Sequence, residues 1–221
     1  MSKYEKNQFA VIGLGQFGQA LAIKLSELGK DVLVIDRNEQ LINDISPKVT
    51  HAIVADAEDE QVLRSVGISN FDVVCVCMSS NMEANILITL MAKEMGVPYV
   101  VSKASTERHK HVLQKIGADL VVFPEDNMGK KLATQLLNPL ITDITDISTT
   151  FKIVELHCPD LWVNKKVAEI DIRRTFGLSI IVIKRSSNAI NPEASTVILQ
   201  DDTLVLGGDV EGFDRLTKKL F

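Results

Sequence analysis

A glycine-rich turn between an apolar run and a helical stripe constrains the fold of this chain more than any other feature. Residues 9–18 read Phe-Ala-Val-Ile-Gly-Leu-Gly-Gln-Phe-Gly, which matches G-x-G-x-x-G after a strand. In such a turn Gly13 permits the tight bend, Gly15 lets a pyrophosphate approach the backbone, and Gly18 allows close packing of helix on strand. The motif therefore predicts a βαβ unit whose first turn binds a nucleotide phosphate.

Short apolar runs alternate with helical stripes through residues 1–137. We predict strands over 9–12, 32–35, 52–54, 73–77, 99–102 and 120–123. Most are rich in valine and isoleucine, as expected for strands buried on both faces of a parallel sheet. Helices are predicted between them, and Gly29 ends the first. We expect residues 1–137 to form a doubly wound α/β domain, a Rossmann-type nucleotide-binding domain.

The character of the sequence changes after Leu137. Residues 138–150 mix apolar side chains with many hydroxyls, which predicts a linker or crossover. From residue 151 to 221 we expect a small α+β domain. It has predicted strands over 153–156, 178–183, 196–199 and 203–206, a short helix near 165–170, and a last helix capped by Asp209.

The segment 82–95 is apolar around nearly its whole circumference. Ile86, Leu87, Ile88, Leu90 and Met91 follow one another there with little polar interruption. A helix of this kind is buried on more than one side, either beneath other elements or at a subunit interface. We favour the interface, and so expect a homo-oligomer.

Composition and charge argue against several classes of partner. The net charge of −5 and the pI near 5.4 disfavour nucleic acid and anionic membranes, which usually bind basic faces. No apolar run approaches the ~20 residues of a membrane span, and the N-terminus lacks the apolar region of a secretory signal. Cys75, Cys77 and Cys158 fit a reducing compartment and are too few for a metal site. We expect a soluble cytoplasmic protein without a nucleic-acid partner.

Further site residues are predicted where strands end. Asp36, 18 residues beyond Gly18, would accept hydrogen bonds from ribose hydroxyls. Asp56 either lies at the adenine edge or is an aspartate at a helix N-terminus. Lys103 either reaches phosphate oxygens or is an exposed lysine. Glu125 begins a helix, where a dipole partner is the main interpretation and a cation ligand the lesser one. The predicted nucleotide site also includes Gln16, Phe17, Arg37 and Ala57.

The sequence carries no recognisable catalytic signature. It lacks G-x-S-x-G and H-E-x-x-H, and its second part shows no evident catalytic cluster. His109 and His111 are two residues apart on a predicted helix, so they do not share a face for a metal. We therefore expect a binding protein and not an enzyme. An NAD-dependent oxidoreductase is the alternative, and it would need a base that the sequence does not reveal.

Several segments resemble the Ktr/Trk family of potassium-uptake regulators, which are RCK proteins (regulators of potassium conductance). They are residues 9–18, Asp36, Val112-Leu-Gln-Lys-Ile-Gly-Ala-Asp119, Phe123-Pro-Glu125-Asp-Asn-Met-Gly129 and Asp171-Ile-Arg173-Arg-Thr-Phe-Gly177. The resemblance covers nearly the whole chain. It implies dimers that build an octameric ring on the cytoplasmic side of a membrane potassium transporter or channel. It also implies that ATP or ADP on the first domain sets the shape of the ring and hence conductance.

The resemblance also implies roles for individual residues. Glu125 matches a cation site near the nucleotide phosphates at a subunit interface. Firmicute-type members bind cyclic di-AMP between two C-terminal domains, and the matching residues here are Ile172, Arg173, Phe176, Ile180 and Pro192. Many relatives have an arginine at the position of Gln16 that meets the terminal phosphate of ATP. Glutamine is uncharged and cannot make that charge-assisted bond, so ATP, ADP and NAD(H) all remain candidates.

Overall fold

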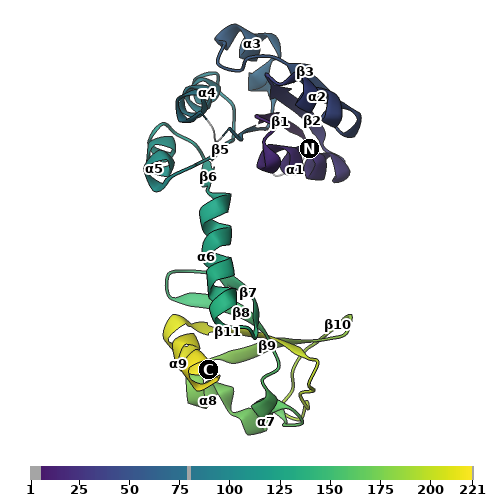
Figure 1. The fold of residues 1–221 in the computed structure, drawn as a ribbon, viewed down its shortest axis with the longest axis vertical. Coiled ribbons are helices and arrows are strands. Elements are labelled where there is room, and N and C mark those ends of the chain that lie inside the picture. The colour runs from purple at the N-terminus through teal and green to yellow at the C-terminus, as the bar shows by residue number, and fades with distance from the viewer. Residues whose placement is uncertain (1–5, 79–80, 221) are drawn as a thin grey trace. The chain divides into compact units, whose positions relative to one another are not determined.

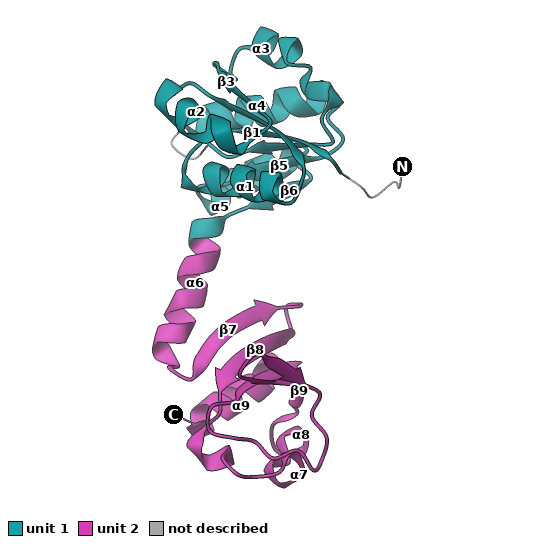
Figure 2. Cartoon of the chain, turned by 90° about the vertical axis from the view of Figure 1, so that its right-hand side faces the viewer, with its two compact units in different colours: residues 1–125 teal, residues 126–221 magenta. Residues whose placement is uncertain are grey.

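The computed structural model describes residues 6–78 and 81–220 and divides the chain into two compact units, 1–125 and 126–221 (Figure 2). The first contains a six-stranded parallel sheet in the order β3-β2-β1-β4-β5-β6 (Figure 1). Its strands are β1 (Gln8–Ile12), β2 (Asp31–Asp36), β3 (His51–Val54), β4 (Val73–Val76), β5 (Val100–Lys103) and β6 (Leu120–Val122). The order reverses between β1 and β4, which confirms the predicted doubly wound Rossmann-type domain.

Helices cover both faces of this sheet. They are α1 (Gln16–Glu27), α2 (Glu39–Ile45), α3 (Glu60–Ser65), α4 (Met82–Glu94) and α5 (Glu107–Lys115), with 3-10 turns η1 (Ser46–Lys48) and η2 (Ile68–Asn70). Because side chains alternate along a strand, Val11 packs with residues of α1 and α2, whereas Ile12 packs with residues of α3 and α4. Cys75 and Cys77 lie together on the α1–α2 face. Burial raises the pKa of Cys75 to about 12, so its thiol stays protonated at neutral pH.

Helix α4 is buried on one side only. Ile88 and Met91 pack into the core of the first unit, while Leu87 remains 41% exposed. Asn85 is fully buried, and its amide donates hydrogen bonds to the carbonyl oxygens of Met78 at 2.8 Å and Lys103 at 3.2 Å. Burial beneath other elements therefore accounts for part of the apolar circumference. Through these hydrogen bonds α4 positions the chain just beyond β4 and at the end of β5. Both segments lie at the carboxyl edge of the parallel sheet.

The second unit contains most of α6 (Pro124–Leu137) and a five-stranded antiparallel sheet in the order β10-β9-β11-β8-β7. Its strands are β7 (Ile141–Asp146), β8 (Phe151–His157), β9 (Ser179–Arg185), β10 (Asn188–Ile190) and β11 (Thr203–Asp209). The remaining elements are η3 (Asp160–Trp162), α7 (Val167–Ile170), α8 (Ile172–Phe176) and α9 (Val210–Leu220). As predicted, Asp209 caps α9, because its carboxylate accepts a hydrogen bond from the Gly212 N–H at 2.5 Å. Within the described part of the chain, no helix is long and apolar enough to cross a bilayer.

Three sequence predictions differ from the structure. Residues 138–150, predicted as a linker, contain β7, whose threonines are β-branched and therefore suit a strand as well as a loop. Residues 196–199 form no strand, and only Val197 makes an isolated bridge, with Lys166. The boundary between the two compact units falls after Glu125, inside α6, whereas the predicted boundary followed residue 137.

Candidate functional site

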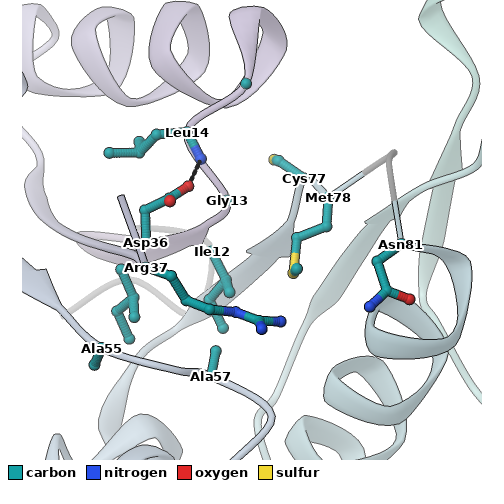
Figure 3. A pocket seen from close by; sticks show the side chains of 12 residues that line it. Ile12, Gly13, Leu14, Asp36, Arg37, Ala55, Ala57, Cys77, Met78 and Asn81 are labelled. Atoms are coloured by element: carbon teal, nitrogen blue, oxygen red, sulfur yellow. Dashed lines mark hydrogen bonds between the residues drawn. The ribbon is translucent and has the colours of Figure 1, made fainter. Parts of the chain in front are cut away.

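A pocket of about 380 Å³ opens at the carboxyl ends of β1, β2 and β4 (Figure 3). The strand order reverses at this edge, and open α/β sheets bind their ligands at such a point. Five of the predicted residues come together here, namely Gly13, Gly15, Asp36, Arg37 and Ala57. The other lining residues are Ile12, Leu14, Ile35, Ala55, Cys77, Met78 and Asn81.

The three motif glycines have different local roles. Gly13 has φ +93°, and a Cβ there would overlap Met78. A Cβ on Gly18 would overlap the carbonyl oxygen of Gly13, so this glycine allows α1 to pack against the loop. Gly15 has ordinary extended backbone, and a Cβ there would meet nothing within 4 Å. Gly15 therefore leaves open space at the N-terminus of α1, where unpaired N–H groups attract anions.

Backbone groups fix the carboxylate of Asp36 beside the glycine loop. Its Oδ2 accepts a hydrogen bond from the Leu14 N–H at 2.6 Å, and its Oδ1 accepts one from the Asn38 N–H at 2.8 Å. Each carboxylate oxygen has two lone pairs, so acceptor capacity remains on both. The side chain is thus held in one orientation at the end of β2, with room to accept hydrogen bonds from a ligand.

Asp56 lies outside the set of described residues that line the pocket. Its Oδ1 accepts a hydrogen bond from the Glu58 N–H at 2.9 Å and faces Arg37 Nε at 3.4 Å. Glu58 forms a second ion pair with Arg37, and Asp59 caps α3 by accepting from the Gln61 N–H. Asp56 thus lies in the turn before α3, which Asp59 caps, and a position beside the adenine of a ligand stays a prediction.

Lys103 and Glu125 pair with each other. The Lys103 side chain is only 6% exposed, and its Nζ donates to Glu125 Oε1 at 2.5 Å. This hydrogen bond holds the pKa of Glu125 below its usual value. The ammonium also lies 5.8 Å from the centre of the Phe17 ring. Lys103 is therefore not the exposed lysine of one interpretation.

The Lys103 ammonium already neutralises the carboxylate of Glu125, the predicted cation ligand. Within a single chain this one carboxylate therefore does not fit a cation site. Over 6–78 and 81–220, no group of three or more His, Cys, Asp or Glu side chains is arranged to hold a metal ion. Gln16, the remaining predicted residue, is exposed as the first residue of α1.

The predicted cyclic di-AMP residues are divided between the core and the surface of the second unit. Ile172 and Phe176 of α8 are buried in its apolar core. Arg173 is exposed and donates to Ser179 Oγ at 3.2 Å. Ile180 and Pro192 are half-buried. The side chains still accessible for a ligand are thus those of Arg173, Ile180 and Pro192.

Sequence reasoning missed one whole side of the pocket. Cys77, Met78 and Asn81 line it from the segment between β4 and α4. Their position directly after the fourth strand was the available signal, because β4 flanks the point where the strand order reverses. Glu58 was also missed, since its ion pair with Arg37 joins two separate turns.

Comparison with known proteins agrees with this architecture. The TrkA-N domain family matches residues 9–124, and the TrkA-C domain family matches residues 153–220. The Ktr system potassium uptake protein C of Bacillus subtilis is 38% identical over 216 residues, which cover 97% of this chain and 98% of that protein. The chain belongs to the TrkA/Ktr family of potassium uptake proteins. The Ktr system potassium uptake protein A of Vibrio alginolyticus is 32% identical over 214 residues, which cover 96% of this chain and 96% of that protein.

Solved structures share the TrkA/Ktr fold. The GsuK RCK domain has a TM-score of 0.69 at 19% identity and covers all of this chain, which spans about half (49%) of the solved chain. The NAD(P)-binding domain of an exopolyphosphatase-related protein from Archaeoglobus fulgidus has a TM-score of 0.52 at 25% identity. It covers 60% of this chain and 98% of its own. The fold of part of this chain thus also occurs in a domain described as NAD(P)-binding.

Proposed function

We propose that this TrkA/Ktr family member is a nucleotide-binding regulatory subunit that gates a membrane potassium channel or transporter. The pocket at the glycine loop carries the proposal. A pyrophosphate would lie against the open side of Gly15 and the N-terminus of α1, while Asp36 would accept hydrogen bonds from the ribose. Potassium uptake proteins at 38% and 36% identity over nearly the full length supply the physiological context.

ATP or ADP is the ligand that we propose, with NAD(H) as the alternative. Ala55 and Met78, which line the pocket and are partly exposed, offer an apolar surface for the base. An oxidoreductase would need a proton acceptor beside a nicotinamide. Among the described lining residues the ionisable groups are Asp36, Arg37 and Cys77, and burial raises the pKa of Cys77 far above neutrality. This chemistry favours binding over catalysis.

The test is to identify what copurifies with the full chain. Mass spectrometry of the denatured protein should detect ADP or ATP, and calorimetric titration should then give saturable binding to the stripped protein. Absence of binding for ATP, ADP and NAD(H) alike would contradict the proposal. Consumption of NADH with any carbonyl substrate would favour the oxidoreductase instead.

Self-association and docking on a transporter at the inner membrane face are part of the same proposal. The apolar side chains of α6 lack cover, with Met128, Leu132, Leu136 and Leu137 between 50 and 79% exposed. Leu87 of α4 adds a second exposed apolar position. Patches of this kind favour association, and a dimer could build the octameric ring that the family resemblance implies.

Light scattering on the full chain should therefore give the mass of a dimer or a larger oligomer at micromolar concentration. Leu132→Glu on α6 should weaken the association, whereas Lys24→Glu on the charged surface of α1 should leave it unchanged. A stable wild-type monomer under the same conditions would contradict the prediction.

Two further ligands belong to the proposal only as predictions. A cation at Glu125 would require release of Lys103 and ligands from a second subunit. Cyclic di-AMP on the second unit would use Arg173 for a phosphate, with Ile180 and Pro192 beside it. Neither is needed for the nucleotide pocket itself.

Gln16 is expected to leave discrimination between ATP and ADP weak. An arginine at this exposed position would add a charge and paired donors for a γ-phosphate, and hydrogen bonds to charged groups contribute about 1.5–3 kcal/mol, roughly ten-fold or more in affinity. Lys103 does not replace it within one chain, because Glu125 holds its ammonium. Competitive titration should show little preference in wild type and a clear preference for ATP in Gln16→Arg. A strong ATP preference in wild type that the arginine does not increase would contradict this prediction.

A further inference from the structure

Arg37 extends across the nucleotide pocket from the end of β2 (Figure 3). In this view its guanidinium lies above Ala57, on the side of the pocket away from Leu14. The lining of the pocket also includes the apolar side chains of Ile12, Ala55 and Met78. The glycine loop and Asp36 form the polar part of the pocket. Arg37 therefore belongs to the part that remains for a base once phosphate and ribose lie at the loop.

Two carboxylates hold the guanidinium in this place. Arg37 Nε lies 3.4 Å from Asp56 Oδ1, and its Nη2 donates to Glu58 Oε1. Both acids belong to one turn, in which the Glu58 N–H bonds to the Asp56 side chain and the Asp59 N–H to the Asp56 carbonyl. Arg37 is 51% exposed, so these ion pairs contribute little to stability. Their effect is to orient a planar group that would otherwise move freely.

We propose that the base of the bound nucleotide stacks on the guanidinium plane of Arg37, and that Asp56 and Glu58 set the orientation of this guanidinium. This inference rests on the proposed nucleotide-binding function and adds a determinant of base specificity to it. Guanidinium planes stack on nucleobases, and a purine offers a larger face than a pyrimidine. The stacking gives this pocket a preference for adenine nucleotides over uracil nucleotides.

An arginine after the second strand can instead receive the 2′-phosphate of NADP. The surroundings of Arg37 argue against that role. Asp56 and Glu58 already pair with its guanidinium, and Asp36 adds a third carboxylate at the end of the same strand. The two paired carboxylates more than offset the charge of the guanidinium, and the nearby end of β2 adds a third, so a further phosphate dianion is repelled. A 2′-phosphate is therefore excluded from this part of the pocket.

Calorimetric titration of the full chain with ADP and UDP tests the inference, because the two probes share ribose and diphosphate and differ in the base. Arg37→Ala should weaken ADP about ten-fold and UDP less than two-fold. Arg37→Lys keeps the charge without the plane, so it should behave like Arg37→Ala. Glu58→Gln should produce an intermediate loss for ADP. Thermal unfolding of each variant should match wild type, because the substituted positions are on the surface.

The outcomes separate this inference from the proposed function. If wild type binds none of ADP, UDP, ATP or NAD(H), the proposed function fails. If wild type binds ADP but Arg37→Ala weakens ADP and UDP equally, or Arg37→Lys restores ADP affinity, the stacking role is wrong while the function stands. Adenosine 2′,5′-bisphosphate supplies the last probe. Tighter binding of it than of ADP, lost in Arg37→Ala, would identify Arg37 as a phosphate receptor and overturn the proposal.

Discussion

Gly15→Val is expected to abolish nucleotide binding and leave the fold intact. A Cβ at this position meets nothing within 4 Å and the backbone is extended, so valine is accommodated in the free protein. The new side chain would occupy the space where a pyrophosphate must approach the first turn of α1. Loss of two hydrogen bonds to a charged group, at about 1.5–3 kcal/mol each, predicts affinity at least about a hundred-fold weaker.

Two other glycines supply controls for that experiment. Gly129 lies in α6, where a Cβ also meets nothing within 4 Å, so Gly129→Val should bind ADP as wild type does. Gly18→Val should instead unfold the first unit, because its side chain would overlap the carbonyl oxygen of Gly13. Calorimetry with ADP and circular dichroism distinguish the three variants. Wild-type affinity in a folded Gly15→Val protein would remove the glycine loop from the binding site.

The sequence was sufficient for those parts of the fold that depend on local pattern. Runs of valine and isoleucine identified all six parallel strands, because a strand buried on both faces has to be apolar at successive positions. The glycine spacing located the loop that lines the pocket, since Gly13 and Gly18 are required by backbone geometry that only glycine meets. Asp36 followed from its place at the end of the second strand.

Local sequence patterns could not predict ion pairs between side chains that lie far apart in the chain. Lys103 and Glu125 are 22 residues apart and meet only because β5 ends beside the start of α6. Arg37 and Glu58 are 21 residues apart and meet across two turns. Each of these side chains has several rotamers, so the sequence could place its backbone at the correct edge of the sheet without indicating its partner.

The strand β7 was missed for a different reason. Its sequence is a three-residue repeat of isoleucine, threonine and aspartate, and these polar residues are equally common in loops. Pairing with β8 decides the matter, because Ile144 pairs with Val154 and packs against the core of the second unit. Tertiary contact thus overrides a composition that by itself favours an irregular segment.

Arg185→Met is expected to destabilise the second unit more than any surface substitution there. Asp202 is 1% exposed, and Arg185 meets both of its carboxylate oxygens, at 2.7 and 2.8 Å. Removing one partner of a buried pair leaves an uncompensated charge, which costs about 3–5 kcal/mol. Because Arg185 is a third exposed, we expect about 2 kcal/mol, or a decrease of roughly 10 °C in the melting temperature of this unit. Lys184→Met, which breaks a neighbouring exposed pair with Glu155, should have little effect.

The pH dependence of this destabilisation tests its cause. Burial by itself would raise the pKa of Asp202, but hydrogen bonds from Arg185 and the Leu199 N–H hold it below its ordinary value. In wild type the ionised carboxylate therefore stabilises the fold above pH ~4, and this contribution is lost as the pH falls through the folded pKa. In the variant without Arg185, we expect burial to raise the pKa of Asp202 above its value in the unfolded chain. The native state then binds the proton more tightly than the unfolded state does, so the free energy of unfolding of the variant decreases as the pH rises. Denaturant unfolding should give a difference between wild type and Arg185→Met that is largest near pH 7 and shrinks toward pH 4. A difference independent of pH would mean that Arg185 acts through packing and its bond to the Val197 carbonyl, not through the charge of Asp202.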